Sequence, residues 1–205
     1  MSPRPYRLGQ RQANTEQTRS RIINATRELL MTSHGFTQFS IDLVARQADV
    51  ARMTVYHQFG SKIGLLEALC DSLAASGGME QLASAFQQPE SRDALSAYIT
   101  TFGHFWDADR LVTRRLRALA ALDPEFEQVL HSRDERRRKG VRTLIERMAA
   151  QHGCPAPEKI EDAVAILFTL ISFESFDSIA GNTRSLEEIT PLICQLSQTA
   201  IEHLR

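Results

Sequence analysis

The sequence has few cysteines. Its 205 residues include three, at positions 70, 154 and 194, far apart and without C-x-x-C spacing. An odd, scattered set of thiols predicts neither a disulfide framework nor a zinc site. Each cysteine is therefore expected to be a small apolar residue rather than a redox sensor, in a protein of the reducing cytoplasm.

Long apolar runs are also missing. The longest, over residues 163–171, has nine residues, which is too short for a membrane-spanning helix. Residues 1–17 are polar and contain three Arg, so they do not form a secretory signal. Ten Gly and seven Pro exclude a fibrous or low-complexity chain, and a hydrophobic content of 42% excludes wholesale disorder. We expect a globular protein without a membrane partner.

Motifs for catalysis are absent as well. The six His are scattered, and the sequence contains neither an H-E-x-x-H nor a G-x-S-x-G motif nor a phosphate-binding P-loop. The sequence therefore predicts no catalytic residue, no metal site and no cofactor. We do not expect an enzyme.

Net charge is nearly zero overall but not along the chain. The total is −1, yet residues 1–65 hold nine basic and four acidic side chains, a net of +5. The remaining residues carry a net of −6. Such asymmetry points to a nucleic-acid surface in the basic part. Residues 1–15, with Arg4, Arg7 and Arg11 and no acid, are predicted to be a flexible basic arm that either contacts DNA or is a disordered tail.

Alternation typical of strands is missing, whereas a period of 3.6 residues recurs, so the chain is predicted to be all-α. Gly35 is expected to end the first helix in the left-handed conformation, and Ser40 to cap the second. Pro191 is expected near a helix start, because Pro deep inside a helix costs about 3 kcal/mol. The expected helices cover residues 16–33, 40–49, 52–59, 62–75, 91–107, 110–122, 124–152, 157–180 and 187–204.

The second and third of these helices are only a few residues apart, which predicts a helix-turn-helix over about 39–58. In the third helix, Val55 and Phe59 point into a small core, while Met53 and His57 point away from it. The outward face carries no acid, so it suits a helix that enters the major groove of DNA. A purely structural three-helix bundle is the alternative interpretation.

One stretch resembles a known family. The run from Ser40 to Lys62, above all Thr-Val-Tyr-His-Gln-Phe-Gly-Ser-Lys over 54–62, resembles the DNA-binding signature of TetR-family transcriptional regulators. The resemblance covers about residues 16–75. By position it implies DNA contacts by Ser40, Arg52, Met53, Thr54, Tyr56, His57 and Lys62, and Arg46 is either a further backbone contact or a solvated side chain.

The resemblance also implies the domain organisation. It indicates a homeodomain-like, three-helix DNA-binding domain over 16–62 and a helical ligand-binding and dimerisation domain over 63–205. In a homodimer the last two helices would pair with their symmetry mates, through apolar residues that include Ala163, Ile166, Leu170, Leu192, Leu196 and Ala200.

Three residues depart from the family pattern. Asp49 replaces the usual Gly of the turn, Ala51 replaces a Ser or Thr cap, and Gly64 replaces an acidic residue of a capping box. An absent cap costs a helix about 1 kcal/mol. The departures predict helix ends that stay loose until DNA orders them.

Aromatic and polar side chains of the C-terminal part are candidates for an effector pocket, with core packing and buried ion pairs as the alternative. The candidates are Phe102, Phe105, Trp106, Arg114, Arg117, Phe126, His131, Phe168, Phe173 and Glu174, with Asp177 as a further anchor. The basic run 136–139 is expected to be a solvated helix face, with ion pairs Asp134–Arg138 and Glu135–Lys139, rather than a second DNA site.

These features predict a sequence-specific DNA-binding transcriptional regulator. The favoured form is a ligand-responsive repressor that binds a palindromic double-stranded operator as a homodimer and responds to a small-molecule effector. Two alternatives stay open. One is a DNA-binding protein of the same fold without an inducer, either architectural or activating. The other is a small-molecule-binding or catalytic helical domain whose helix-turn-helix is vestigial.

Overall fold

A computed structural model describes residues 4–204, with side chains from residue 12 onward. Over these residues the chain contains helices and no strands, which confirms the predicted all-α class. It divides into two compact units. The first, here the head unit, combines the chain up to Ser72 with Leu111–Glu127, and the second, the body unit, combines Leu73–Arg110 with the chain from Gln128.

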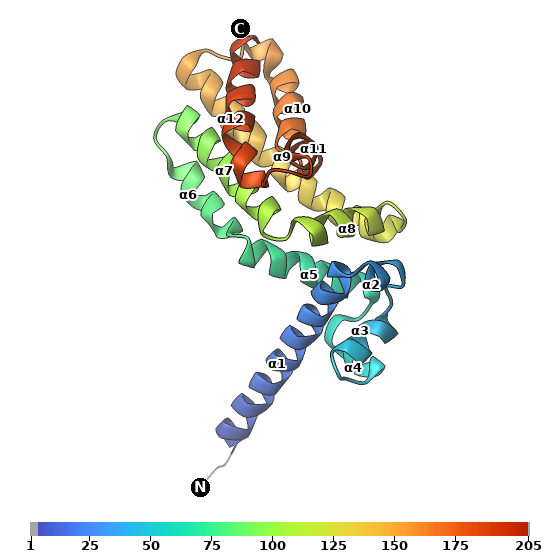
Figure 1. Cartoon of the computed structure of the whole chain (residues 1–205). Helices are drawn as coiled ribbons and strands as arrows, with labels where there is room; N and C mark the ends of the chain where they lie inside the picture. The colour runs from blue at the N-terminus through green and yellow to red at the C-terminus, as the bar shows by residue number, and fades with distance from the viewer. Residues whose placement is uncertain (1–3, 205) are drawn as a thin grey trace. The chain divides into compact units, whose positions relative to one another are not determined.

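The head unit is built around a small core shared by four helices, which are labelled in Figure 1. They are α1 (Arg4–Met31), α3 (Ile41–Gln47), α4 (Arg52–Phe59) and α5 (Lys62–Ser76). Leu65 of α5 packs in this core, so the boundary predicted at residues 62–63 falls inside the unit. The buried core residues are Ile22, Ala25, Leu29, Ile41, Val44, Ala45, Ala48, Val55 and Leu65.

The first helix begins earlier than predicted. Because α1 starts at Arg4, residues 4–15 continue the helix instead of forming the expected flexible arm. Pro5 falls in the first turn, where its missing N–H removes no helix hydrogen bond, and the Arg, Leu and Gln that follow favour helix. The side chains of Arg4, Arg7 and Arg11 lie outside the described residues.

A short helix that the sequence did not predict follows α1. In α2 (Ser33–Thr37), Thr32 is the N-cap, and its hydroxyl accepts a hydrogen bond from the Gly35 N–H at 2.9 Å. Gly35 does not take the left-handed conformation predicted for it. It is needed for a different reason, since a Cβ there would lie 2.4 Å from the Leu29 carbonyl oxygen.

The head unit also contains most of α8 (Arg110–Ala120) and the start of α9 (Pro124–His152). Arg115 of α8 donates a hydrogen bond to the Leu30 carbonyl at 2.5 Å, and its guanidinium lies 5.4 Å from the ring centre of Phe36. A residue far away in sequence thus fixes the corner between α1 and α2.

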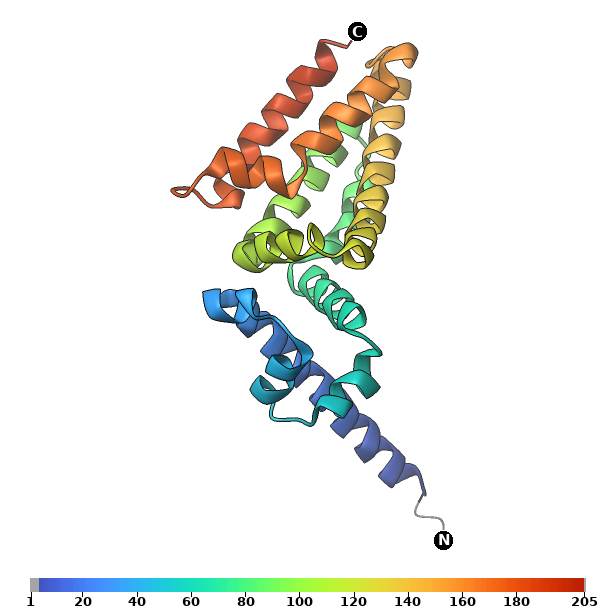
Figure 2. The ribbon, with the colours of Figure 1, turned by 90° about the vertical axis from the view of Figure 1, so that its right-hand side faces the viewer.

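The body unit is a bundle whose core lies mainly between α7 (Ser91–Ala108), α9 and α12 (Leu186–Glu202). Met79–Gln81 forms the 3-10 helix η1, and α6 (Leu82–Gln87) then packs against α7. Figure 2 shows α10 (Ile160–Leu170, orange) beside α12 (red), a neighbourhood that their contacts confirm. The largest fully buried side chains of this unit are Tyr98, Phe176, Leu95, Ile99, Leu144 and Ile145.

The helix predicted over 157–180 is interrupted. It consists of the 3-10 helix η2 (Pro157–Lys159), α10 and α11 (Phe173–Ala180), and the two longer parts meet at a bend of 54°. Ser172 begins α11 as its N-cap, because its hydroxyl accepts from the Ser175 N–H at 3.1 Å. A serine cap inside an apolar run therefore overrides the continuous periodicity.

Pro191 lies inside α12 rather than near its start. The helix begins after Ser185, where Ser185 and Glu188 form a reciprocal capping box. Two satisfied backbone N–H groups fix the start there, and the later proline is accommodated.

Within the described residues, no single helix has the length and apolarity of a membrane span. The bent pair of residues 157–170 and 173–180 reaches that length and composition together, as buried core helices also do.

Candidate nucleic-acid interface

The turn between α3 and α4 sets the geometry of the predicted reading surface. Asp49 has a φ of +51°, the left-handed conformation that the family pattern assigns to Gly. The Val50 N–H then donates to the Ala45 carbonyl at 3.0 Å, which closes the turn. Asp is among the few side chains that tolerate this conformation, so the substitution keeps the motif.

The two helices begin differently. Ser40 caps α3 as predicted, and its hydroxyl accepts from the Leu43 N–H at 3.3 Å. Ala51 precedes α4 in an extended conformation and supplies no side-chain cap. The first turn of α4 thus lacks a side-chain acceptor, and free N–H groups at a helix start favour an anion such as phosphate.

The side chains of α4 separate into an inner and an outer face. Val55 is fully buried in the head core, and Tyr56 and Phe59 pack against that core. Met53 exposes 59% of its surface, and Arg52 and His57 are also exposed. The outer face therefore presents Arg52, Met53 and His57 to solvent, with half-buried Thr54 on its flank.

The far end of α4 is held by α1. Arg19 of α1 donates to the Gln58 carbonyl at 3.0 Å, and its guanidinium lies 4.5 Å from the ring centre of Phe59. Gly60 follows with a φ of +74°, which allows the chain to turn into α5. Arg19 was not among the predicted site residues, because its role depends on a contact 39 positions away.

Lys62 is the first residue of α5, beside the end of α4. Its ammonium group lies 3.8 Å from the carboxylate of Asp123 and 5.8 Å from the ring centre of Phe39. Gly64, predicted to loosen this helix start, is instead required there, since a Cβ would lie 2.1 Å from the Phe59 carbonyl oxygen. Its N–H is satisfied by the Ser61 hydroxyl at 2.9 Å.

One acidic residue next to the reading face was missed by the sequence reasoning. Asp42 of α3 lies 3.2 Å from Arg52 of α4, and the Arg52 guanidinium also donates to the Tyr56 hydroxyl at 3.3 Å. The hydrogen bond to Tyr56 and the charge of Asp42 raise the pKa of Arg52 above its ordinary value. The outer face of α4 itself carries no acid, as predicted, but Asp42 of α3 places a carboxylate next to it.

Comparisons with known proteins agree on the motif. Residues 22–69 match the family model described as bacterial regulatory proteins of the tetR family. A Mycobacterium tuberculosis protein, MftR, named as a transcriptional regulator of mycofactocin biosynthesis, is 28% identical over 127 residues. That match covers 61% of this chain and 61% of the relative, so it spans less than two thirds of the relative's length.

The fold is shared with solved structures along nearly the whole chain. A TetR transcription regulator from Haloarcula marismortui has a TM-score of 0.71 at 15% identity, over 92% of this chain and 98% of that one. The regulator FadR from Bacillus subtilis, solved in complex with stearoyl-CoA, has a TM-score of 0.66 at 18% identity, over 87% and 96%.

Residues 22–69 thus match the DNA-binding part of the TetR family, and the chain shares its fold with solved TetR-family regulators. TetR-family proteins are DNA-binding transcriptional regulators and not enzymes. Six of the seven residues predicted to contact DNA, Ser40 to His57, lie in the α3–α4 region of the matched segment, and Lys62 begins the next helix within it.

The residues predicted to line an effector pocket fall in both units. Phe102, Phe105, Trp106 and Phe173 form an aromatic cluster in the body unit, with ring centres 4.5 Å apart for Phe105–Trp106 and 5.7 Å apart for Trp106–Phe173. Phe126, Arg114 and Arg117 belong to the head unit. His131 and Glu174 of the body unit are exposed, and Asp177 pairs with Arg110 at 2.6 Å.

The basic run 136–139 is only partly the solvated face expected. Arg136 and Lys139 are exposed, but the side chain of Arg137 is 4% exposed. Its guanidinium lies 4.4 Å from the ring centre of Phe168 and donates to the Ile171 carbonyl at 3.2 Å. The ion pairs also differ from those predicted, since they join Asp134 to Arg137 and Glu135 to Arg138.

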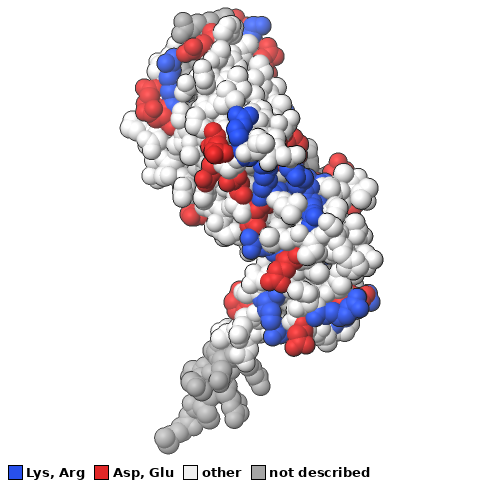
Figure 3. All heavy atoms as spheres, in the orientation of Figure 1, with Lys and Arg blue, Asp and Glu red and all other residues white. Residues whose placement is uncertain are grey.

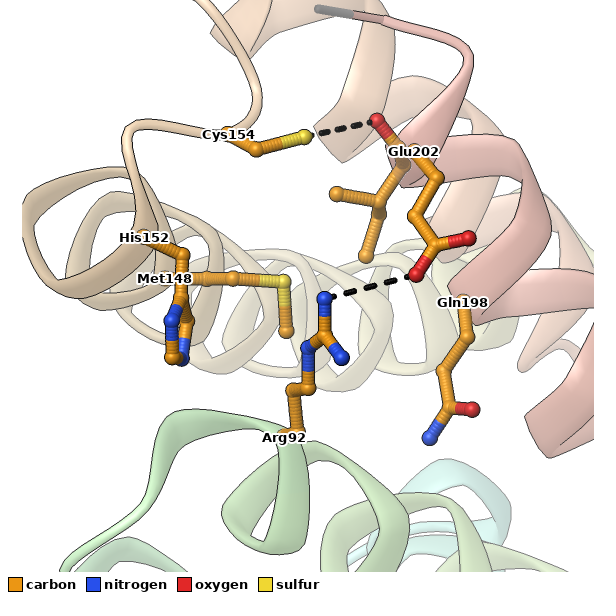
Figure 4. A pocket seen from close by; sticks show the side chains of 7 residues that line it. Arg92, Met148, His152, Cys154, Gln198 and Glu202 are labelled. Atoms are coloured by element: carbon orange, nitrogen blue, oxygen red, sulfur yellow. Dashed lines mark hydrogen bonds and ion pairs between the residues drawn. The ribbon is translucent and has the colours of Figure 1, made fainter.

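A pocket in the body unit is lined by other residues (Figure 4). Arg92 reaches across it to Glu202 at 3.3 Å, and the Cys154 thiol donates to the Ile201 carbonyl at 3.1 Å. None of the predicted effector residues is among its lining residues, which are Arg92, Met148, His152, Cys154, Gln198, Ile201 and Glu202.

Proposed function

We propose that the chain is a cytoplasmic, ligand-responsive repressor that binds a palindromic operator as a homodimer. The observation that carries the proposal is the acid-free outer face of α4, whose inner face packs on the head core and whose start has no side-chain cap. Such a face can supply donors to base edges while its flanks bind phosphates.

The predicted contacts are assigned as follows. Ser40 and Lys62 would bind phosphates, because one caps a helix start and the other carries a half-exposed ammonium group. Arg52 and Thr54 would reach base edges, and Met53 would contact the methyl group of thymine. Tyr56 and His57 would hold phosphates or base edges.

DNA binding is tested by selection from random duplexes with the full chain. We expect an inverted repeat whose half-sites lie about 34–36 Å apart, as two symmetry-related reading helices require. The variant Lys62→Met should weaken binding to all sequences and reduce the salt slope by about one. Lys139→Met in the body unit makes the same charge change and is the control. Equal affinities of the two variants would reject the assignment of Lys62.

Support for a homodimer comes from α10 and α12. Ile166, Leu192 and Leu196 expose 37%, 38% and 40% of their surface on these two neighbouring helices. Exposed large apolar side chains on adjacent elements are typical of a partner interface.

The variant Leu196→Glu tests the dimer, because it places a charge in the proposed interface. It should convert the dimer to a monomer in light scattering and reduce operator affinity. Leu122→Glu is the matched control, since Leu122 is 83% exposed on the head unit. A Leu196→Glu protein that stays dimeric would exclude this interface.

Support for an effector comes from the aromatic cluster of the body unit and from the fold shared with FadR, which was solved with stearoyl-CoA. An apolar pocket with few polar anchors is typical of small-molecule sites. A compound that both raises the melting temperature and releases operator DNA would establish an effector. The coupling free energy between compound binding and DNA binding is expected to be about 1–3 kcal/mol. A stabilising compound without effect on DNA binding would favour a regulator without an inducer.

A further inference from the structure

The guanidinium group of Arg52 is held in place before any ligand arrives. Asp42 of α3 accepts a hydrogen bond from Nη1 at 3.2 Å, and the Tyr56 hydroxyl accepts one from Nη2 at 3.3 Å. The ring of Tyr56 lies beneath the group, with its centre 5.5 Å away. Two helices therefore fix one long side chain that is otherwise 56% exposed.

These contacts leave most of the hydrogen-bonding capacity of Arg52 unused. A guanidinium has five N–H donors, and Asp42 and Tyr56 take two of them. Two of the remaining three can form a bidentate contact, and the preferred base for such a contact is guanine, through O6 and N7. Arg52 is also the first residue of α4, and residues at the start of a reading helix contact base edges.

The carboxylate of Asp42 argues for a base rather than a phosphate. An Arg–Asp pair has almost no net charge, so it gains little from the phosphate backbone, where binding energy comes from the release of counterions. Hydrogen bonding to a neutral base edge depends much less on the net charge of the pair than phosphate binding does. A fixed side chain also loses less conformational entropy on binding than a free one.

We propose that Asp42 determines specificity by positioning Arg52 to read one guanine in each half-site. This inference rests on the proposed function, because it requires an operator. Asp42 itself touches no base in this proposal, and acts through Arg52.

Selection from random duplexes with the full chain tests the proposal. The variant Asp42→Asn should still enrich the wild-type motif, but its preference for guanine at one position of each half-site should fall about fivefold or more, the lower end of the range of a bidentate contact. The control is Glu16→Gln, which removes the same charge from an exposed position on α1 of the same unit, outside the reading motif. It should raise affinity for all sequences and leave the preference unchanged.

A double-mutant cycle separates positioning from charge. In an Arg52→Met background, Asp42→Asn should have no further effect on base preference, because the side chain on which it acts is gone. Asp42→Glu retains the charge but displaces the carboxylate, so it should also weaken the preference. This variant serves as the test should the Asn variant melt at a lower temperature than wild type.

The failure of the inference differs from the failure of the proposed function. If Asp42→Asn and Asp42→Glu give the wild-type guanine preference, the positioning role is overturned while the operator remains. If the wild-type protein enriches no sequence, the operator itself is excluded and the inference fails with it.

Discussion

The ammonium group of Lys62 lies 3.8 Å from the carboxylate of Asp123, the residue that precedes α9 in the same unit. A phosphate at Lys62 would compete with this carboxylate. Asp123 also caps the start of α9, because its side chain accepts a hydrogen bond from the Phe126 N–H at 3.4 Å. Both interactions can be separated, because Asn also caps helices but carries no charge.

We therefore expect Asp123→Asn to raise DNA affinity about two- to fivefold, the range of a partly exposed ion pair. The gain should appear in salt-dependent titrations of the operator and shrink as salt increases. In a Lys62→Met background the gain should vanish. An equal gain in that background would show that Asp123 acts by general repulsion of DNA instead.

The start of α4 offers a second prediction. Ala51 occupies the N-cap position and provides no acceptor, so Ala51→Thr should raise the free energy of unfolding of the head unit by about 1 kcal/mol. Ala51→Val is the isosteric control, because it adds the same bulk without a hydroxyl. Chemical unfolding followed by circular dichroism measures both, and equal stabilities would exclude capping as the cause.

Local features of the reading motif were predictable from the sequence. The serine cap of α3 and the outward direction of Met53 depend only on neighbours within a helical turn or two, where capping rules and periodicity apply. The Asp49 turn follows from the short separation of the two helices. Local chemistry thus predicts the shape of the motif.

Contacts between distant residues were not predictable. The Asp42–Arg52 pair joins two residues ten positions apart on different helices, and the buried Arg137 lies over a ring on another helix. The pattern of charges along the sequence predicts that such residues are solvated, because it does not indicate which face of the helix packs against another element. The break of α10 and α11 at Ser172 was missed since apolar periodicity outweighed a single cap.

Gly64 gives a third prediction, which reverses its expected role. A Cβ at this position would lie 2.1 Å from the Phe59 carbonyl oxygen. Gly64→Ala should therefore lower the free energy of unfolding by about 1–3 kcal/mol, although Ala is the better helix former. Ser72→Ala on the same helix is the control and should be neutral or stabilising. A stabilised Gly64→Ala protein would show that the backbone yields easily here.

The last prediction concerns acid stability of the body unit. Arg142 of α9 binds the carboxylate of Glu161 in α10 through two hydrogen bonds, at 2.6 and 2.7 Å, and these bonds lower the pKa of Glu161 below its ordinary value. A lowered carboxyl pKa adds stability that is fully present above the pKa of the unfolded chain, about 4.3 for Glu. This stability is lost as the pH falls through the lower, folded-state pKa.

The melting temperature of Glu161→Gln should therefore lie below that of the wild type at pH 6, and the difference should close between about pH 4.3 and the more acidic range. Glu158→Gln removes a carboxylate from the neighbouring turn while leaving the Arg142–Glu161 pair intact, so it is the control. If the ionised Arg142–Glu161 pair stabilises the fold, the difference in melting temperature between Glu161→Gln and wild type must depend on pH. A difference that persists unchanged at pH 3 would instead assign the loss to packing of the longer side chains.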